Sequence, residues 1–182
     1  MRKPPAIETI GTETAAVLSV SPAEEVHFSL QEIFNHSRWK LHKTHSLPAA
    51  LAIIRAQTIP VVLCETDLVP GTWRDLLDQI ARTPDPPAVI VSSRLADDRL
   101  WAEALNLGAW DVLARPFVKS EVFQSVSAAW RHWWNRQERP ASTGLGKNYR
   151  SPSRFLVNFA RRTGDIGLAG ILLSNAAKGV SP

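Results

Sequence analysis

Short apolar runs alternate with segments of helical periodicity along the first three quarters of the chain. Each apolar run is short enough for a buried strand, and each is followed by apolar residues three or four positions apart. The expected strands are 15–20, 39–42, 61–64, 88–91 and 111–114. Five such alternations predict an α/β fold with a parallel sheet, right-handed crossovers and helices on both faces.

Turn and capping residues place the helices between these strands. Ser21, Pro22 and Glu24 form one predicted helix start, with serine as the N-cap, proline at the first helical position and glutamate completing a capping box. The other expected helix boundaries are marked by Ser46, by Thr72 with Asp75, by Ala96, by Gly108 and by Ser120. The last helix is expected to end near Arg136.

This alternation stops near residue 137 and divides the chain into three parts. Residues 1–13 are expected to be a loose leader, residues 14–137 a domain, and residues 138–182 a basic linker and tail that is disordered or forms a short amphipathic helix. No apolar run reaches the length of a membrane span, and the N-terminus lacks the apolar segment of a signal peptide. The sequence therefore predicts a cytoplasmic location.

Composition and charge narrow the choice of partner. Hydrophobic residues make up 45% of the chain and charged residues 21%, which is typical of a globular protein. Residues 138–182 carry seven Lys or Arg and two acidic residues, a net charge of +5, which leaves −1 for the rest of a chain whose total is +4. Nucleic acid or an anionic membrane is therefore a possible partner only of the tail. The single cysteine, Cys64, excludes a disulfide framework and a cysteine-based zinc site.

The segment 108–117 reads Gly-Ala-Trp-Asp-Val-Leu-Ala-Arg-Pro-Phe. It resembles the last strand of response regulator receiver domains, where the pattern is Gly-Ala-x-x-x-Leu-x-Lys-Pro-Phe, with an invariant lysine followed by a cis proline. Arg115 stands at the lysine position. The resemblance covers residues 15–137, so the domain expected at 14–137 is receiver-like. It implies a flavodoxin-like sheet of strand order 2-1-3-4-5 and a role in a two-component phosphorelay.

The same resemblance assigns the site residues. Receivers hold magnesium with two acidic residues after the first strand and accept a phosphoryl group on an aspartate ending the third. It places the acidic pair at Ser21 and Pro22, the acceptor at Glu65, and the groups that read the phosphate at Ser92 and Arg115. Serine and proline offer no carboxylate, so the magnesium site is expected to be lost. Glutamate is not expected to replace aspartate as an acceptor.

These departures favour a pseudo-receiver that acts by protein contact without phosphorylation and is not an enzyme. Glu65 would supply a fixed charge of about −1, against roughly −1.5 to −2 for a phosphate. Two alternatives remain open at this stage. Asp67 becomes a phosphorylatable acceptor if the loop is shifted by two residues, or Glu65 is simply a solvated carboxylate paired with Arg115. A third alternative is nucleic-acid or membrane binding through the tail.

The last expected helix carries two apolar stripes, whereas a helix on one face of a sheet needs only one. The second stripe, Phe123, Trp130 and Trp134, predicts an exposed aromatic patch, to which Trp101 and Trp110 are added as candidates. The resemblance implies that a histidine kinase, an effector or a second copy binds the face made by the fourth helix, fifth strand and fifth helix. The alternative is that these tryptophans belong to a wider core or lie under the tail.

The histidines show no metal-binding spacing with a carboxylate or cysteine, and each is expected to face solvent. They are His27, His36, His42, His45 and His132.

Overall fold

The structure, a computed structural model, describes residues 14–137. The leader and tail expected at 1–13 and 138–182 therefore lie outside the described residues, as does any partner bound through the tail. No helix within 14–137 is both long and apolar enough to cross a bilayer.

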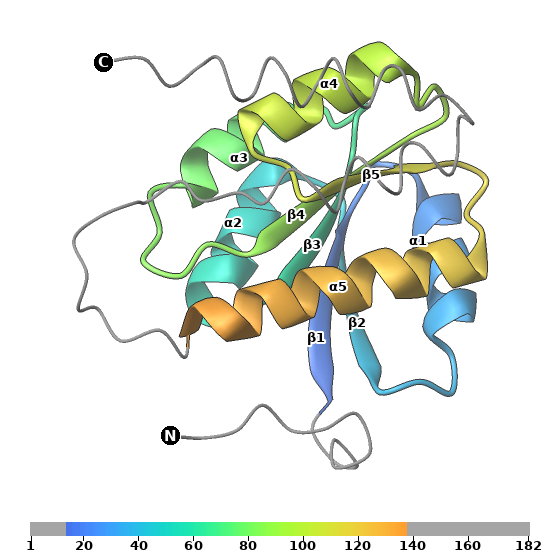
Figure 1. Ribbon diagram of the computed structural model, residues 1–182, viewed down its shortest axis with the longest axis horizontal. Coiled ribbons are helices and arrows are strands. Elements are labelled where there is room, and N and C mark those ends of the chain that lie inside the picture. Colours follow the sequence, from blue (N-terminus) through green and yellow to red (C-terminus); the bar gives the residue numbers. More distant parts are fainter. Residues whose placement is uncertain (1–13, 138–182) are drawn as a thin grey trace. The chain divides into compact units, whose positions relative to one another are not determined.

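Five β-α units follow one another along the described chain (Figure 1). The strands are β1 (Ala15–Val20), β2 (Trp39–Thr44), β3 (Val61–Glu65), β4 (Ala88–Ser93) and β5 (Asp111–Ala114). The helices are α1 (Glu24–Phe34), α2 (Leu47–Ala56), α3 (Trp73–Ile80), α4 (Asp98–Leu107) and α5 (Lys119–Gln137). All four strand pairings are parallel, and the sheet order is β2-β1-β3-β4-β5. The predicted doubly wound fold and its strand order are confirmed.

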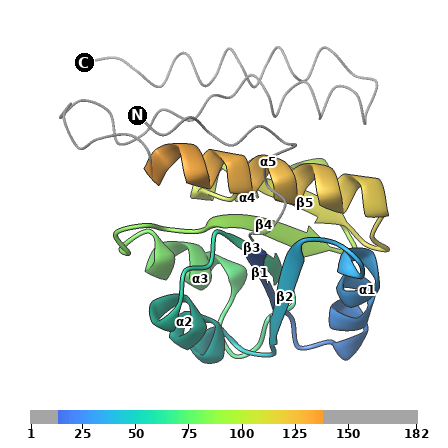
Figure 2. The same cartoon turned by 90° about the horizontal axis from the view of Figure 1, so that it is seen from below.

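The sheet lies between two layers of helices (Figure 2). One hydrophobic cluster joins β1, β3 and β4 to α2, α3 and α4, and the other joins them to α1 and α5. Every residue of β3 is buried, because this central strand is covered on both faces. Adjacent residues of β3 therefore serve opposite clusters: Val62 and Cys64 belong to the first, and Val61 and Leu63 to the second.

Two of the predicted helix boundaries are confirmed in atomic detail. Thr72 and Asp75 form the capping box of α3, in which the Asp75 amide donates to the Thr72 hydroxyl oxygen at 3.2 Å and the Thr72 amide donates to the Asp75 carboxylate at 2.8 Å. Gly108 ends α4 with φ of 117°, a left-handed conformation that glycine adopts without a Cβ clash.

Other boundaries differ from the prediction. Helix α1 begins at Glu24, its N-cap is Ala23, and Ser21 does not cap it. Helix α4 begins at Asp98 with Asp97 as its cap, two residues later than predicted. Ser120 lies inside α5 and is not its cap, because that helix begins at Lys119. The Ser21 hydroxyl takes part in a tertiary contact instead, which is described with the functional site.

The aromatic residues of α5 do not form the exposed patch that was predicted. The Phe123 ring packs edge-on against Phe34 of α1 with centroids 5.8 Å apart, and the Trp130 ring packs against Trp39 of β2 at 6.4 Å. Both belong to the margin of the second hydrophobic cluster, which confirms the alternative of a wider core for these two residues. Trp101 is also corrected, because it is only 8% exposed and is part of the first cluster.

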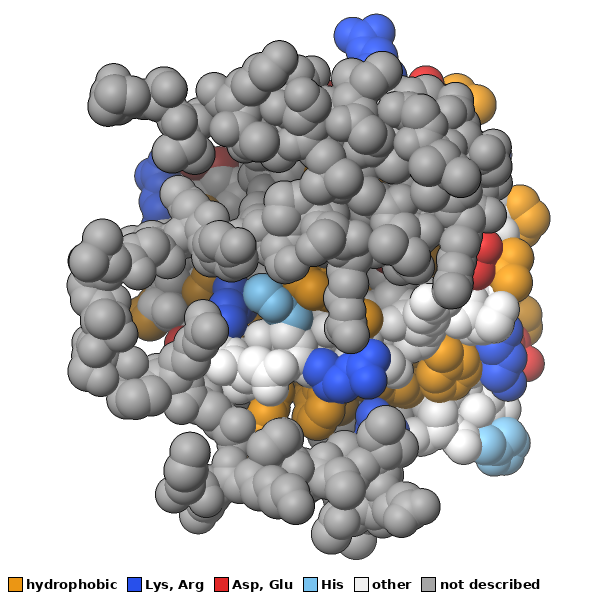
Figure 3. Space-filling view, in the orientation of Figure 1, with side chains coloured by type: hydrophobic (Ala, Val, Ile, Leu, Met, Phe, Trp, Pro, Cys, Tyr) orange, Lys and Arg blue, Asp and Glu red, His pale blue; other side chains and the backbone are white. Residues whose placement is uncertain are grey.

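Trp110 and Trp134 are half-buried. The Trp134 ring stacks on Trp130 with centroids 5.6 Å apart, and the Trp110 ring lies against His132 at 4.5 Å. Where the described surface is visible in Figure 3, hydrophobic, basic and uncharged side chains are interspersed. The large apolar side chains that are more than half exposed lie elsewhere, at Phe28, Val69, Leu95 and Val118.

Candidate functional site

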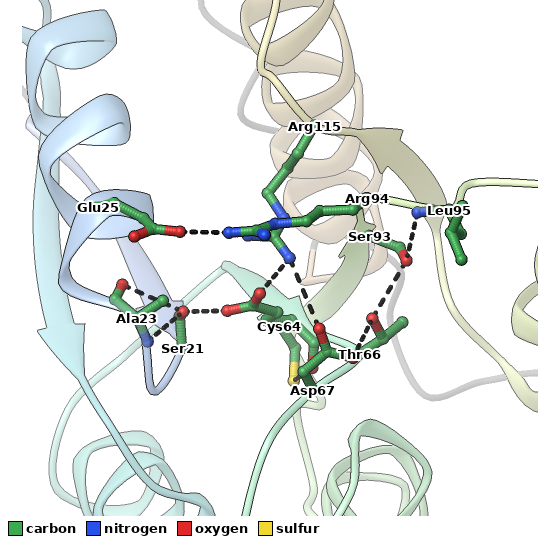
Figure 4. A network of polar contacts seen from close by, with 11 residues as sticks. Ser21, Ala23, Glu25, Cys64, Thr66, Asp67, Ser93, Arg94, Leu95 and Arg115 are labelled. Atoms are coloured by element: carbon green, nitrogen blue, oxygen red, sulfur yellow. Dashed lines mark hydrogen bonds and ion pairs between the residues drawn. The ribbon is translucent and has the colours of Figure 1, made fainter.

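The polar residues singled out in the sequence meet at one edge of the sheet. Parallel strands bring their carboxyl ends to the same edge, and in such folds ligands bind there. Ser21 directly follows β1, Glu65 ends β3, and Arg115 directly follows β5. Ser92 lies beside Glu65 in the pairing of β3 with β4. Side chains from the ends of β1, β3, β4 and β5 surround one small region, where the side chain drawn from β4 is that of Ser93 (Figure 4).

Glu65 is the centre of this region. Its side chain is 4% exposed, and each of its two carboxylate oxygens has its own partner. Oε1 forms an ion pair with Nη2 of Arg115, and Oε2 accepts a short hydrogen bond from the Ser21 hydroxyl. The Ser21 oxygen also accepts from the Ala23 amide at 3.0 Å, which holds the β1–α1 turn against the carboxylate. The sequence placed Glu65 and Arg115 together, and the structure brings Ser21 to them.

Arg115 is buried almost as completely as Glu65, with 7% of its side chain exposed. Its backbone amide donates to the Ser93 carbonyl at 2.9 Å, which anchors the residue to the end of β4. Among the described residues, neither Nε nor Nη2 has a partner in hydrogen-bond geometry, although Nη2 touches the Glu65 carboxylate. The contact is therefore an ion pair in which the N–H bonds are not aligned with the oxygen.

Asp67 lies at the outer side of the same guanidinium. Its Oδ2 is 3.9 Å from Nη2 of Arg115, at the limit of an ion pair, and its side chain is 72% exposed. The Thr66 hydroxyl joins Asp67 to β4, because it lies 3.3 Å from Oδ1 of Asp67 and 3.2 Å from the Ser93 hydroxyl. The Ser93 oxygen in turn accepts from the Leu95 amide at 3.1 Å.

The hydroxyl of β4 that joins this network is that of Ser93, whereas the sequence singled out Ser92. Ser92 is buried and 2% exposed, and its carbonyl accepts from the Thr66 amide at 3.0 Å. Thr66 and Ser93 were missed in the sequence. Ser93 could have been considered from the sequence, because Ser92 and Ser93 are adjacent at the end of an apolar run. Adjacent strand residues point to opposite faces of the sheet, so the two hydroxyls serve different faces.

A hollow of about 350 Å³ opens between α1 and the segment after β5. Glu25 and Arg94 face each other across its rim in an exposed ion pair, with Nη2 of Arg94 2.5 Å from Oε1 of Glu25. The remaining lining residues are Val26, Ser29, Arg115, Pro116 and Phe117. The buried Arg115 therefore has two roles: it lines the hollow, and it is the ion-pair partner of Glu65.

Comparison with known proteins identifies the family of this chain. The family profile of the response regulator receiver domain matches residues 17–127. The chain belongs to the response regulator receiver family. A search of curated proteins finds no match.

Solved receiver structures share the fold at low sequence identity. The signal receiver domain of an HD domain-containing protein from Pseudomonas fluorescens Pf-5 is 22% identical with a TM-score of 0.65, over 71% of this chain and 96% of that one. The receiver domain of a LuxO repressor protein from Vibrio parahaemolyticus is 17% identical with a TM-score of 0.63, over 68% and 95%. The beryllofluoride-activated NtrC4 receiver domain dimer is 23% identical with a TM-score of 0.60, over 65% and 98%.

The proline after Arg115 in this receiver forms a cis peptide bond, as the resemblance implied. Ser21 and Pro22, the positions expected for the acidic pair, directly follow β1. The Ser21 hydroxyl donates to the Glu65 carboxylate, and Pro22 is exposed. At this edge the Glu65 carboxylate therefore contacts the Arg115 guanidinium through one oxygen and the Ser21 hydroxyl through the other.

Cys64 lies next to Glu65 on β3, and its side chain points into the first hydrophobic cluster. Burial, with a smaller contribution from the nearby Glu65 charge, raises the pKa of the thiol to about 12 from its ordinary 9.0. At pH 8 the thiolate fraction is then roughly a thousandfold lower than in the unfolded chain.

Alkylation by iodoacetamide at pH 8 is expected to be about a thousandfold slower in the native receiver than in urea, measured by intact mass against time. The chain has one cysteine, so the mass shift reports this thiol alone. Comparable rates in the two conditions would contradict the buried environment of Cys64.

His27 corrects the expectation that every histidine faces solvent. It is fully buried on α1, with Nδ1 3.0 Å from the Ser19 hydroxyl and Nε2 3.0 Å from the Ser21 carbonyl oxygen. Burial lowers the pKa of its imidazole, so the neutral ring is favoured. A carbonyl only accepts, so in the neutral ring Nε2 carries the proton and Nδ1 accepts from the Ser19 hydroxyl.

Proposed function

We propose that this chain is a receiver-type signalling domain that acts in the cytoplasm by protein contact, with Glu65 in the place of a phosphorylated aspartate. Its conformation is then set by a permanent ion pair and does not depend on phosphoryl transfer. The observation that carries this proposal is the state of the Glu65 carboxylate, because both oxygens are engaged by other side chains. A carboxylate in that state is not free to attack a phosphoryl donor.

The contacts around Glu65 also argue against a magnesium ion at this edge. Magnesium prefers six oxygen ligands in octahedral geometry and is usually held by carboxylates and water. Here the Ser21 hydroxyl is hydrogen-bonded to the Glu65 carboxylate, and Pro22 has no oxygen in its side chain. The Asp67 carboxylate is exposed and faces the guanidinium of Arg115, and the Glu25 carboxylate is paired with Arg94. The residues present do not fit the ion, and no step of the proposed function uses it.

The electrostatics support a single stable state. In a receiver that is switched by phosphorylation, the cation at the end of the fifth strand interacts with the charge of the phosphoryl group, which is present only in the phosphorylated state. The charge that Arg115 meets here is built into the chain and lies in direct contact with it. With the input fixed, a change of state can come only from a partner that binds one conformation more tightly than another.

We place the contact with a protein partner on the face made by α4, β5 and α5. A histidine kinase, an effector and a second copy are the classes of partner proposed. Phe123 and Trp130 pack against α1 and β2, so the proposal uses Trp110 and Trp134, which are also half-buried. Trp side chains are favoured at interface hot spots because they present a large apolar area with few rotatable bonds.

Phosphorylation of the full-length protein tests the proposal directly. Incubation with magnesium and acetyl phosphate is expected to give no phosphoryl adduct by intact mass, under conditions in which a receiver with the full acidic set is labelled. The Asp67→Asn variant is incubated in parallel, because Asp67 is exposed and lies 3.9 Å from Arg115.

A magnesium-dependent adduct on the wild-type chain would overturn the proposal. If that adduct disappears in Asp67→Asn, the chain is a receiver with its acceptor shifted by two residues. If it persists there and disappears in Glu65→Gln, the ion pair at Glu65 opens more readily than its burial indicates.

A further inference from the structure

A second group of ionisable side chains lies on the other side of the β1–α1 turn. Glu24 and His27 come from the first turns of α1, and His45 comes from the segment between β2 and α2. One donor atom from each of the three lies within 4.8 Å of the other two. Within 14–137 no other such group of three histidine, cysteine or acidic residues occurs. Sequence spacing did not reveal it, because His45 is far from the other two along the chain.

The two imidazoles converge on one point. Nε2 of His27 and Nδ1 of His45 lie 3.0 Å and 3.2 Å from the same oxygen, the carbonyl of Ser21. Their ring centroids are 4.8 Å apart in an edge-to-face arrangement. The third member is close by, because Oε2 of Glu24 is 3.5 Å from Nε2 of His45. The nitrogen of His45 near Glu24 is Nε2, whereas Nδ1 faces the Ser21 carbonyl, so the exposed imidazole of His45 has to turn for one nitrogen to join His27 and Glu24 around a cation.

We propose that Glu24, His27 and His45 bind a divalent transition metal ion of the zinc type. Two imidazoles and one carboxylate are a ligand set suited to zinc, cobalt, nickel or copper and poorly suited to magnesium. Three protein ligands leave a fourth tetrahedral position for water or for a partner's side chain. The proposal is independent of the proposed function, since it uses none of the contacts of Glu65.

The distances are compatible with such an ion after a small rearrangement. Metal–ligand bonds of 2.0–2.1 Å in a tetrahedron require donor separations of roughly 3.3 Å. The three donors must therefore draw together by up to about 1.5 Å from their present spread of 4.8 Å. His27 is fixed in the interior, while the side chains of His45 and Glu24 are 58% and 72% exposed and are free to turn toward it.

Ser19 supplies the outer support that a metal-bound histidine needs. Ligand histidines typically donate their second ring N–H to an oxygen, which fixes the ring and its tautomer. When a metal takes Nε2 of His27, the ring proton moves to Nδ1, which lies 3.0 Å from the Ser19 hydroxyl. A hydroxyl both donates and accepts, so Ser19 satisfies Nδ1 in either tautomer. The buried ring can therefore exchange its proton for a metal without leaving Nδ1 unpaired.

The test is a titration of the full-length, untagged protein with Co²⁺, followed by its visible absorption and by displacement with Zn²⁺. One equivalent is expected to bind with the intense absorption of a tetrahedral cobalt site. His45→Gln and Glu24→Gln are each expected to weaken binding by more than about tenfold, since even the loss of an outer-shell group costs that much. Both side chains are exposed, so neither substitution threatens folding.

His42→Gln is the matched control. His42 precedes His45 by three residues and lies 3.5 Å from the exposed Gln57 amide, outside the proposed site. It is expected to bind cobalt like the wild type. No tetrahedral spectrum, or a spectrum that survives His45→Gln and Glu24→Gln unchanged, would overturn the proposal. So would binding that is lost in His42→Gln alone.

Discussion

Replacing Arg115 with alanine is expected to lower the free energy of unfolding by about 3–5 kcal/mol, because it leaves the buried carboxylate of Glu65 without its cation. The side chains of Arg115 and Glu65 are 7% and 4% exposed, so the Glu65 charge depends on its protein partners more than on water. The Ser21 hydroxyl still donates to Oε2, but a single neutral hydrogen bond compensates only part of the cost. Urea denaturation followed by circular dichroism measures the loss.

Arg94→Ala is the matched control for this substitution. Arg94 is also an arginine paired with a glutamate, Glu25, but the two side chains are 69% and 65% exposed. An exposed pair contributes about 0–1 kcal/mol, so the control is expected to change little. Equal losses in Arg115→Ala and Arg94→Ala would show that the Glu65 charge is not buried in solution.

A double substitution separates the cost of an unpaired charge from the worth of the pair. Glu65→Leu combined with Arg115→Met removes both charges and keeps an apolar volume, and such replacements are often neutral or stabilising. The double variant is therefore expected to be more stable than Arg115→Ala. If the double variant is also as stable as the wild type, the stability of the sheet does not require the ion pair. The pair would then matter for the arrangement it fixes at the edge of the sheet.

Much of the fold was predictable because its signals are local. Apolar runs, helical spacing and capping residues placed all five strands and the ends of several helices. The observed strands β2, β3 and β4 are longer than predicted, and each extension is polar: Thr44, Glu65 and Ser93 are the last residues of these strands. A search for apolar runs stops at such residues, because it assumes that a buried strand has no polar atoms. At the functional edge the Glu65 carboxylate and the Ser93 hydroxyl are buried and find partners in other segments, Ser21 and Thr66.

In the functional site, the pairing of the two opposite charges was predictable, whereas the contact of the Ser21 hydroxyl was not. The resemblance to receiver domains placed an acidic residue at the end of β3 and a basic residue after β5, and parallel strands bring both ends to one edge, so Glu65 and Arg115 were paired correctly. The Ser21 hydroxyl was assigned to the backbone of α1, since serine often caps a helix. In the structure the hydroxyl donates to the buried carboxylate of Glu65, while its oxygen accepts from the Ala23 amide and does not cap the helix. Local sequence gave no sign of the tertiary contact with Glu65.

His27 shows the same limit. On a helical projection it is a polar residue among apolar ones, and such a residue usually marks the solvent side. Its partners, the Ser19 hydroxyl and the Ser21 carbonyl, come from β1 and the turn after it, and they make its burial possible. The residues that sequence reasoning missed are therefore those whose environment is set by a second segment, not by their own.

Trp73→Ala is expected to cost about 3–5 kcal/mol, the range for removing a large aromatic side chain from a core. Trp73 opens α3 and is only 1% exposed, within the cluster that also contains Leu68. Leu68 directly follows Asp67, so the cavity left by the indole is expected to loosen the loop that carries Asp67 beside Arg115. Urea denaturation measures the loss, and hydrogen exchange across residues 66–72 measures the loosening.

Phe28→Ala is the control for the loss of an aromatic ring. Phe28 is 65% exposed on α1, so its removal is expected to change stability by less than about 0.5 kcal/mol. A loss in Trp73→Ala no larger than that in Phe28→Ala would contradict the buried position of the indole. A full loss of stability with unchanged exchange in 66–72 would show that the loop is held by the contacts of Thr66 and Ser93 and not by the core beneath it. The two measurements together separate what stabilises the domain from what positions its functional edge.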